Sequence, residues 1–220
     1  MGTTRDRRRS RTRSAILDAA LGMMAEDGLD GVAIREVARR LDYSPAALYR
    51  YFDGRDQLIA ALGADAAEHL AERLRAVEAA SAAERLRGLG LAYLSFAAEE
   101  PARFRLLFVE LPSSRTSLAE GPPPTSPYVI VVQAARDAIE SGALSRTLDP
   151  EVVAYTLWSL VHGMAVLGST HLKGFSADLE SAHRAALDLL IASWKPAPTA
   201  GPGEDADGEH IRYGSAPVAG

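Results

Sequence analysis

The most specific chemistry in this 220-residue sequence lies in a short run of residues around position 50. Arg50 carries a forked guanidinium that can donate two hydrogen bonds to the edge of a guanine, or bind a phosphate. Tyr49 precedes it. Pro45, Ala46 and Ala47 are small, so they permit close approach to a duplex and contact with a thymine methyl group. These residue types indicate recognition of double-stranded DNA.

Two short helices joined by a tight turn are predicted to position these side chains. The apolar residues of the first helix recur at the i, i+3, i+4, i+7 spacing of one helical face, and they are Ile34, Val37, Ala38 and Leu41. A break follows at residues 42–43. Ser44 is a natural N-cap and Pro45 a natural first residue for a second helix over 45–51. This pattern is typical of a helix-turn-helix, whose second helix enters the major groove.

The expected contact surface consists of the positions on the second helix that face away from its core. They are Ser44, Pro45, Ala46, Ala47, Tyr49 and Arg50. A single unit of this kind buries too little surface for tight, specific binding. We therefore expect two units on a two-fold dimer, bound to the half-sites of a palindromic operator.

The charge of the chain is divided unevenly, which places the DNA-facing surface at the N-terminus. The net charge is −5, yet residues 1–60 carry eleven arginines against nine acidic residues. The arginines outside the helix-turn-helix concentrate at the start of the chain, as Arg5, Arg7, Arg8, Arg9, Arg11 and Arg13. We expect residues 1–11 to be a disordered basic arm that tracks phosphates or a minor groove. A solubilising tail remains the alternative.

The whole sequence predicts an all-α protein of about nine helices, with no strand pattern. Thr12 is expected to cap a first helix that ends before Gly28, and a long helix is expected over about 56–80. Capping signals at Ser81, Asp149 and Ser176 predict the starts of three later helices. Helices are also expected over about 102–111 and 128–140, with a proline-rich loop over 112–127 between them.

Four regions follow from these elements. They are a disordered basic arm over 1–11, a three-helix DNA-binding domain over 12–58, a larger helical domain for effector binding and dimerisation over 59–195, and a disordered tail over 196–220.

One apolar stretch, residues 152–168, is of the minimum length for crossing a membrane. It contains Thr156, Ser159 and His162, so we expect a helix buried on all sides and no membrane segment. The chain has no cysteine, and no apolar run follows its basic start. These features favour a cytoplasmic protein without disulfides or secretion, and we expect no metal and no cofactor.

The sequence resembles the N-terminal domain of TetR-family transcriptional repressors over roughly residues 12–60. The resemblance is carried by the run from Thr12 to Ala20, by Gly28, by the helix-turn-helix and by the run from Leu48 to Leu58. A second match is Trp158-Ser-Leu-Val-His162-Gly163, which looks like the Trp-x-x-x-His-Gly pattern of one C-terminal subgroup.

Three positions depart from the family pattern. Asp42 stands where glycine is usual at the turn, and aspartate tolerates the left-handed conformation better than most residues. Ala33 stands where a capping threonine or serine is usual, which removes a phosphate-binding hydroxyl and some helix stability. Arg55 replaces a lysine and keeps the charge.

The resemblance also implies roles for individual side chains in the DNA complex. Arg35 would reach a base or phosphate, Tyr49 the backbone or a base edge, Tyr51 a phosphate, and Arg55 would anchor a phosphate near the start of the fourth helix. Tyr51 could instead be core, and Arg35 could pair with a nearby carboxylate. Arg39 and Arg40 are expected to be solvated and to add only to the general field.

A ligand-responsive C-terminal half is the other implication of the resemblance. Family dimers usually join their last two long helices, which here points to about 150–170 and 176–194. The expected pocket lining is mostly aromatic, which suits a hydrophobic small molecule: Phe96, Phe104, Leu107, Phe108, Tyr155, Trp158, His162 and Met164. Each of these could instead be plain core. Ligand binding would lower operator affinity.

The main prediction is therefore a homodimeric repressor released from its operator by a small molecule. Three alternatives stay open. An all-helical enzyme finds little support, because no cluster with metal spacing and no phosphate-binding loop is evident. A protein that kept the fold but lost DNA binding is left possible by Ala33 and Asp42. An activator would use the same operator chemistry.

Overall fold

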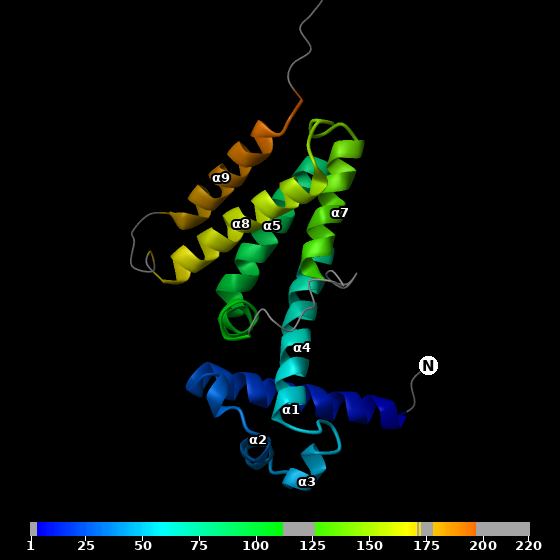
Figure 1. The fold of residues 1–220 in the computed structure, drawn as a ribbon, viewed down its shortest axis with the longest axis vertical. Coiled ribbons are helices and arrows are strands. Elements are labelled where there is room, and N and C mark those ends of the chain that lie inside the picture. Colours follow the sequence, from blue (N-terminus) through cyan, green and yellow to red (C-terminus); the bar gives the residue numbers. More distant parts are fainter. Residues whose placement is uncertain (1–3, 112–125, 171, 173–177, 197–220) are drawn as a thin grey trace, which may run out of the picture.

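The computed structural model describes residues 4–111, 126–170, 172 and 178–196, and within these ranges the protein is all-helical. Figure 1 shows a small unit of three helices, α1 to α3, beneath a larger bundle. The long helix α4 (Arg55–Arg75) rises from the small unit into the bundle. The described residues contain nine α-helices and no strand, which confirms the predicted fold class.

The small unit comprises α1 (Thr4–Asp27), α2 (Ile34–Arg40) and α3 (Pro45–Leu48), with a 3₁₀ turn over Leu29–Gly31. These helices and the first half of α4 share one core, which we call the N-terminal core. Its buried members include Ile16, Leu17, Ala20, Met24, Val37, Ala38, Leu48, Phe52, Leu58 and Leu62. The core holds α2 and α3 in a fixed relation, which leaves the outer side of α3 free.

Local signals set the starts of these short helices as predicted, whereas α3 ends at Leu48 and not at residue 51. The Ser44 hydroxyl accepts a hydrogen bond from the Ala47 amide at 3.3 Å, and Pro45 is the first residue of α3. Asp42 adopts a φ of 56°, so it takes the left-handed conformation that glycine usually supplies. Ala33 caps α2 without any side-chain hydrogen bond.

The start of α1 differs from the prediction. A disordered arm was expected over residues 1–11, with a helix beginning at Thr12, but the helix already begins at Thr4. Arginine is a good helix former, so the basic run extends the helix instead of interrupting it. The Thr12 hydroxyl donates to the Arg8 carbonyl at 3.1 Å, which is a bond inside a helix and not a cap. Residues 1–3 lie outside the described residues.

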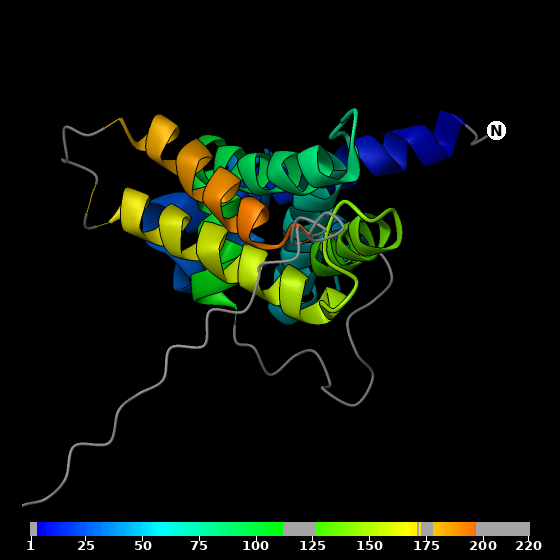
Figure 2. The ribbon, with the colours of Figure 1, turned by 90° about the horizontal axis from the view of Figure 1, so that it is seen from above.

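The larger bundle is built around α5 (Ala82–Glu99). It packs against α4, α7 (Pro127–Glu140), α8 (Pro150–Ser169) and α9 (Leu179–Ser193). A short α6 (Pro101–Arg105) continues into a π-helical turn over Leu106–Glu110. In Figure 2, α8 and α9 lie side by side along one side of the bundle. The C-terminal core includes Leu70, Leu86, Leu89, Tyr93, Phe96, Phe104, Ala135, Val153, Leu157, Val161, Leu187 and Ile191.

Most of the predicted helix starts in this bundle are confirmed. The Ser81 hydroxyl accepts from the Glu84 amide at 3.2 Å, and an Asp149 carboxylate oxygen accepts from the Glu151 amide at 2.7 Å. The cap of α9 is Asp178 rather than Ser176, which lies outside the described residues. The same holds for residues 112–125 of the expected loop and 197–220 of the expected tail.

The apolar helix α8 is not buried on all sides, contrary to the prediction. By length and composition it is the one helix among the described residues that could cross a membrane, yet only 28% of its apolar window is buried. Its inner face packs on α5 and α7. Its outer face exposes Val152, Tyr155 and Leu167, and the neighbouring α9 exposes Leu189. The bundle is therefore left with an uncovered apolar surface on these two helices.

Candidate functional sites

The outer side of α3 presents the side chains expected to meet DNA. Tyr49 is 48% exposed, and Arg50 and Arg35 are exposed. Neither guanidinium forms a hydrogen bond or an ion pair within the described residues. The surrounding positions Ser44, Pro45 and Ala46 are exposed, and Ala47 is half-buried. The structure thus brings the predicted α3 surface together and leaves its cations available to a ligand.

A second group of arginines, in the N-terminal part of α1, adjoins this surface. Arg5, Arg8 and Arg9 line a hollow of about 510 Å³ together with Arg50 and Tyr51. Tyr43 and Thr12 line it too. The guanidinium groups of these three arginines form no hydrogen bond or ion pair in the described part of the chain. Their spacing of three and four residues, applied to a helix, would have predicted one basic face.

Tyr51 combines the two roles that the sequence left open. Its side chain is half-buried and packs against the N-terminal core. It also lines the basic hollow. Because one side of the ring is in the core, its position is fixed relative to the α1 arginines.

Two other arginines of the helix-turn-helix are occupied by neighbouring carboxylates. Arg39 pairs with Glu36, and Arg40 donates to Glu26 at 2.6 Å. The Arg39 guanidinium lowers the pKa of the Glu36 carboxyl through this hydrogen bond. Both arginines are at the surface, so these pairs contribute little to stability. Because of these pairs, the Arg39 and Arg40 guanidinium groups are less available to DNA than that of Arg50.

Arg55 lies at the start of α4, where the family resemblance implies a phosphate anchor, and its guanidinium binds groups of the chain itself. Its Nε donates to the Val32 carbonyl at 2.9 Å and its terminal nitrogen to the Leu29 carbonyl at 2.7 Å. An ion pair with Asp30 at 3.6 Å completes the arrangement. The guanidinium fork thus ties the start of α4 to the 3₁₀ turn before α2. Sequence reasoning missed this because the partners are 23 and 26 residues away.

The aromatic residues expected to line an effector pocket instead pack against one another. Phe104 and Phe108 lie 5.1 Å apart, and Phe108 lies 5.1 Å from His162 and 6.2 Å from Trp158, measured between ring centroids. Tyr93, which the prediction omitted, sits among them at 4.9 Å from Trp158. The space lined by Tyr93 and Trp158 is only about 10 Å³, which is too small for an effector.

Inside this aromatic cluster, the Tyr93 hydroxyl shares a hydrogen bond of 2.8 Å with His162 Nδ1. Burial raises the pKa of Tyr93 and lowers the pKa of His162. Both shifts favour the neutral forms, so the pair is an uncharged hydrogen bond between α5 and α8. His162 therefore satisfies a buried polar partner.

The remaining expected pocket residues are scattered. Phe96 is fully buried in the C-terminal core, and Leu107 packs between the two cores. Tyr155 is 68% exposed on the outer face of α8, and it lines neither the small space beside Trp158 nor the cavity that Met164 reaches. Met164 alone reaches a sizeable cavity. The structure therefore does not bring the predicted lining together around one cavity, because residue type does not reveal which aromatic rings pack against one another.

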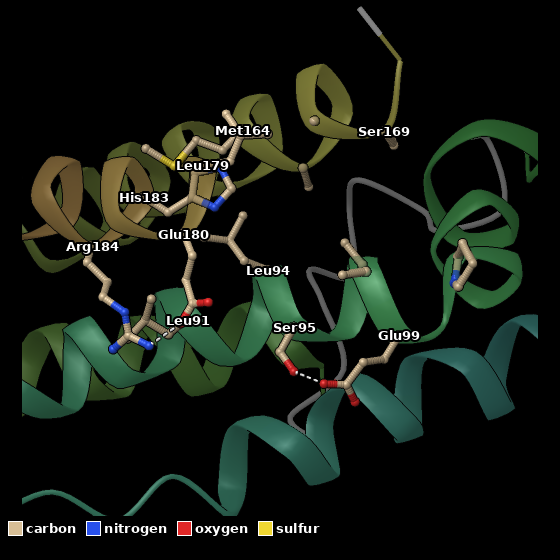
Figure 3. Close-up of a pocket in the computed structure, with 15 residues that line it drawn as sticks. Leu91, Leu94, Ser95, Glu99, Met164, Ser169, Leu179, Glu180, His183 and Arg184 are labelled. Carbon is tan, nitrogen blue, oxygen red and sulfur yellow. Dashed lines mark hydrogen bonds and ion pairs between the residues drawn. The ribbon is translucent and has the colours of Figure 1, made fainter. Parts of the chain in front are cut away.

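The sizeable cavity lies between α5, α8 and α9, with a volume of about 820 Å³ (Figure 3). Leu91 and Leu94 come from α5, Met164 from α8, and Leu179 and His183 from α9. In Figure 3 the side chains of Glu180 and Arg184 point from α9 toward α5. No motif marked this cavity, because helices that are distant in the sequence build its walls.

Comparison with known proteins agrees with this geometry. Residues 16–62 match the model of bacterial regulatory proteins of the tetR family. Residues 86–193 match the model of the tetracyclin repressor-like C-terminal domain. The chain belongs to the TetR family, and it is a DNA-binding transcriptional regulator. The family and the neighbouring proteins are regulators rather than enzymes.

Individual relatives are similar over most of their length. An HTH-type transcriptional regulator of Bacillus subtilis (strain 168), YobS, is 26% identical over 161 residues, which are 71% of this chain and 78% of that protein. A protein of unknown function from Rhodococcus sp. RHA1 has a TM-score of 0.72 at 25% identity, covering 84% of this chain and 95% of the other. The regulatory protein SCO4313 has a TM-score of 0.66 at 29% identity, covering 86% and 100%.

Proposed function

We propose that the protein is a homodimeric repressor that binds a palindromic operator and leaves it when a small molecule binds. The observation that carries this proposal is the set of free arginines on one side of the small unit. The Arg50 and Arg35 guanidinium groups on the helix-turn-helix are exposed and unpaired within the described residues, and Arg50 lines one hollow with the α1 arginines. Polyanion binding is the interaction that such a surface favours.

Within the proposed complex, α3 enters the major groove and Arg50 reads a base. Ser44, Pro45, Ala46 and Ala47 allow the helix to approach closely, and Tyr49 contacts a base edge or the backbone. Arg35 and Tyr51 bind phosphate or sugar. Arg55 positions α4 against the 3₁₀ turn, and any phosphate contact it makes adds to that role.

The proposed dimer forms through α8 and α9. Their outer faces expose Val152, Tyr155, Leu167 and Leu189, which monomeric proteins rarely leave uncovered together. Ala182 and Ala185 of α9 and Ser159 of α8 are exposed and small, so two copies can approach closely. An isologous interface of these helices places two α3 helices on one duplex. The protein then works in the cytoplasm, where the operator is.

The experiment that tests this function is selection of bound DNA from random sequence, at two salt concentrations. We expect a palindrome with two half-sites about one helical turn or more apart. Arg50→Ala should relax the preference at one position of each half-site, whereas Arg39→Ala, which removes a paired arginine, should leave the motif unchanged. Failure to enrich any sequence, or enrichment of a single unrepeated half-site, would contradict the proposal.

A further inference from the structure

The cavity between α5, α8 and α9 has the size of a small-molecule site, and both apolar and polar side chains line it. Its volume of about 820 Å³ lies within the range typical of ligand pockets. Its walls are mostly apolar, with Leu91, Leu94, Met164, Ala165 and Leu179 on three helices. Glu180, His183 and Arg184 line the cavity from α9, and Ser95, Glu99 and Ser169 line it from α5 and α8. A ligand that fits this arrangement has a hydrophobic body and one polar end.

The charges around the cavity differ in how firmly they are held. Glu99 accepts from the Ser95 hydroxyl at 2.7 Å and pairs with Arg73 at 2.9 Å, and these contacts lower its pKa. On the other side, Arg184 pairs with Glu180 at 2.5 Å, but both side chains are largely exposed. An exposed pair of neighbours on one helix contributes little stability. A ligand anion can therefore take the place of Glu180 on Arg184 at small cost.

His183 stands beside this pair, and Figure 3 shows its ring directed toward Leu94 across the cavity. It forms no hydrogen bond or ion pair within the described residues. A neutral imidazole can donate one hydrogen bond, and its protonated form adds a positive charge. Arg184 offers a forked guanidinium that can donate two hydrogen bonds to one anionic group. These two side chains together favour an anionic group over a cationic one.

We propose that this cavity is the effector site and that it takes an amphipathic anion, such as an apolar carboxylate or sulfonate. The anionic group lies against Arg184 and His183, and the apolar body fills the space between Leu94 and Met164. The regulatory role of the site rests on the proposed function. The binding itself does not, so the two can be tested separately.

The floor of the cavity connects to the DNA-binding unit through ion pairs. Glu99 and Pro101 lie at the corner between α5 and α6. Arg73 of α4 holds both Glu99 and Glu100 at 2.9 Å. Beyond the corner, the Arg105 guanidinium of α6 donates to the Met24 carbonyl of α1 at 2.6 Å. A ligand that moves α5 relative to α8 and α9 would therefore also move α4 and α1, the two helices of the DNA-binding end that these contacts reach.

Two fluorescent probes with the same aromatic body test the binding site. 8-Anilinonaphthalene-1-sulfonate is an anionic amphipath, and N-phenyl-1-naphthylamine lacks the sulfonate. We expect the double variant His183→Gln/Arg184→Gln to weaken binding of the sulfonate probe by roughly tenfold or more, and binding of the neutral probe by less than about twofold. Arg136→Gln, on the exposed face of α7, is the charge-matched control and should change neither.

Two further variants fill the cavity from opposite walls. A Cβ added at Gly168 meets no heavy atom within 4 Å, so Gly168→Phe has room for its first carbon on the wall of the cavity. Ala98→Phe does the same from α5, where Ala98 is exposed. Either folded variant should lose most of the binding of both probes, with circular dichroism checking the fold. Unchanged binding in a folded variant, or no binding by the wild-type protein, would overturn the site.

Gel-shift titration of the selected operator then tests regulation. The sulfonate probe should lower operator affinity of the wild-type protein by roughly fivefold or more, and should have little effect on the cavity-filling variants. If the probe occupies the cavity without changing operator affinity, the effector role is wrong. If no operator is selected at all, the proposed function fails while the probe titrations still decide whether the site exists.

Discussion

The two halves of the molecule expose opposite kinds of surface: the small unit exposes unpaired arginines, and the larger bundle exposes an apolar face. Around the small unit, Arg5, Arg8, Arg9 and Arg50 are exposed without a partner in the described residues. In the larger bundle, Arg73, Arg87, Arg103 and Arg184 are all paired with carboxylates, and the uncovered surface is apolar. Free cations need a polyanion and a free apolar face needs a protein surface. We therefore infer that one half binds DNA and that the other binds a second copy of the chain.

The largest expected effect comes from placing a charge on the apolar face of the bundle. Tyr155→Glu or Leu189→Glu should convert the dimer to a monomer and weaken operator binding by roughly 100-fold or more, because two linked binding units become one. Sedimentation and gel-shift titration measure both quantities. Val109→Glu is the matched control, since Val109 is also 68% exposed but lies before α7 rather than on α8 or α9. A dimer that survives both substitutions would refute this interface.

The next effect concerns Arg50, the free arginine just after α3. Arg50→Ala should reduce operator affinity by about 1–3 kcal/mol per half-site, because the variant has no forked donor for the base. Competition titrations with operators altered at each position should show a relaxed preference at one position. Arg40→Ala serves as control, because Arg40 is occupied by Glu26. Equal decreases in both variants would remove the distinction between free and paired arginines.

Arg55 tests the distinction between free and paired arginines in another way, because its guanidinium is held by backbone carbonyls of the small unit. Arg55→Ala should lower the free energy of unfolding by about 2 kcal/mol, since two carbonyls lose a charged donor. Arg55→Lys should recover only part, because an ammonium cannot reproduce the fork. Chemical denaturation measures the change. Unaltered stability together with a salt slope reduced by about one unit would assign Arg55 to a phosphate instead.

The smallest effect concerns the neutral pair in the bundle. Burial lowers the pKa of His162 below its ordinary value of 6.5. The unfolded chain therefore binds an extra proton as the pH falls through about 6.5, and the free energy of unfolding decreases on acidification. His162→Gln keeps a hydrogen-bonding partner for Tyr93 and should flatten this part of the profile. An identical pH dependence of stability in the variant and the wild type, between pH 5.5 and 7.5, would argue against the neutral pair.

The sequence predicted correctly those features whose interacting residues are close to one another along the chain. The caps at Ser44, Ser81 and Asp149 and the left-handed Asp42 were predicted correctly, because each involves atoms within a few residues. The α3 surface followed from the same local pattern. The predicted start of α1 at Thr12 is wrong, because the arginines before Thr12 have a high helix propensity and the helix begins at Thr4.

The effector half was predicted less well, because its geometry depends on how distant helices pack. The phase of Leu86 and Leu89 in α5 would have placed Tyr93 on the buried face, but nothing in the sequence shows that it meets His162, 69 residues away. Tyr155 and Trp158 are three residues apart on α8, yet one is exposed and the other packs on the core. Which side of a helix faces a cavity is decided by its neighbours.

The central claim is that the unpaired arginines of α1, together with Arg50 just after α3, bind the DNA backbone and bases. The salt dependence of operator binding tests it most directly, by comparing Arg5→Gln/Arg8→Gln/Arg9→Gln with the paired-arginine control Arg39→Gln/Arg40→Gln. We expect the triple variant to shallow the slope of log K against log salt by about 0.9 for each phosphate that is no longer neutralised, with the selected motif unchanged. The control should keep the wild-type slope. A triple variant with the wild-type slope, or a control whose slope falls as far, would contradict the claim.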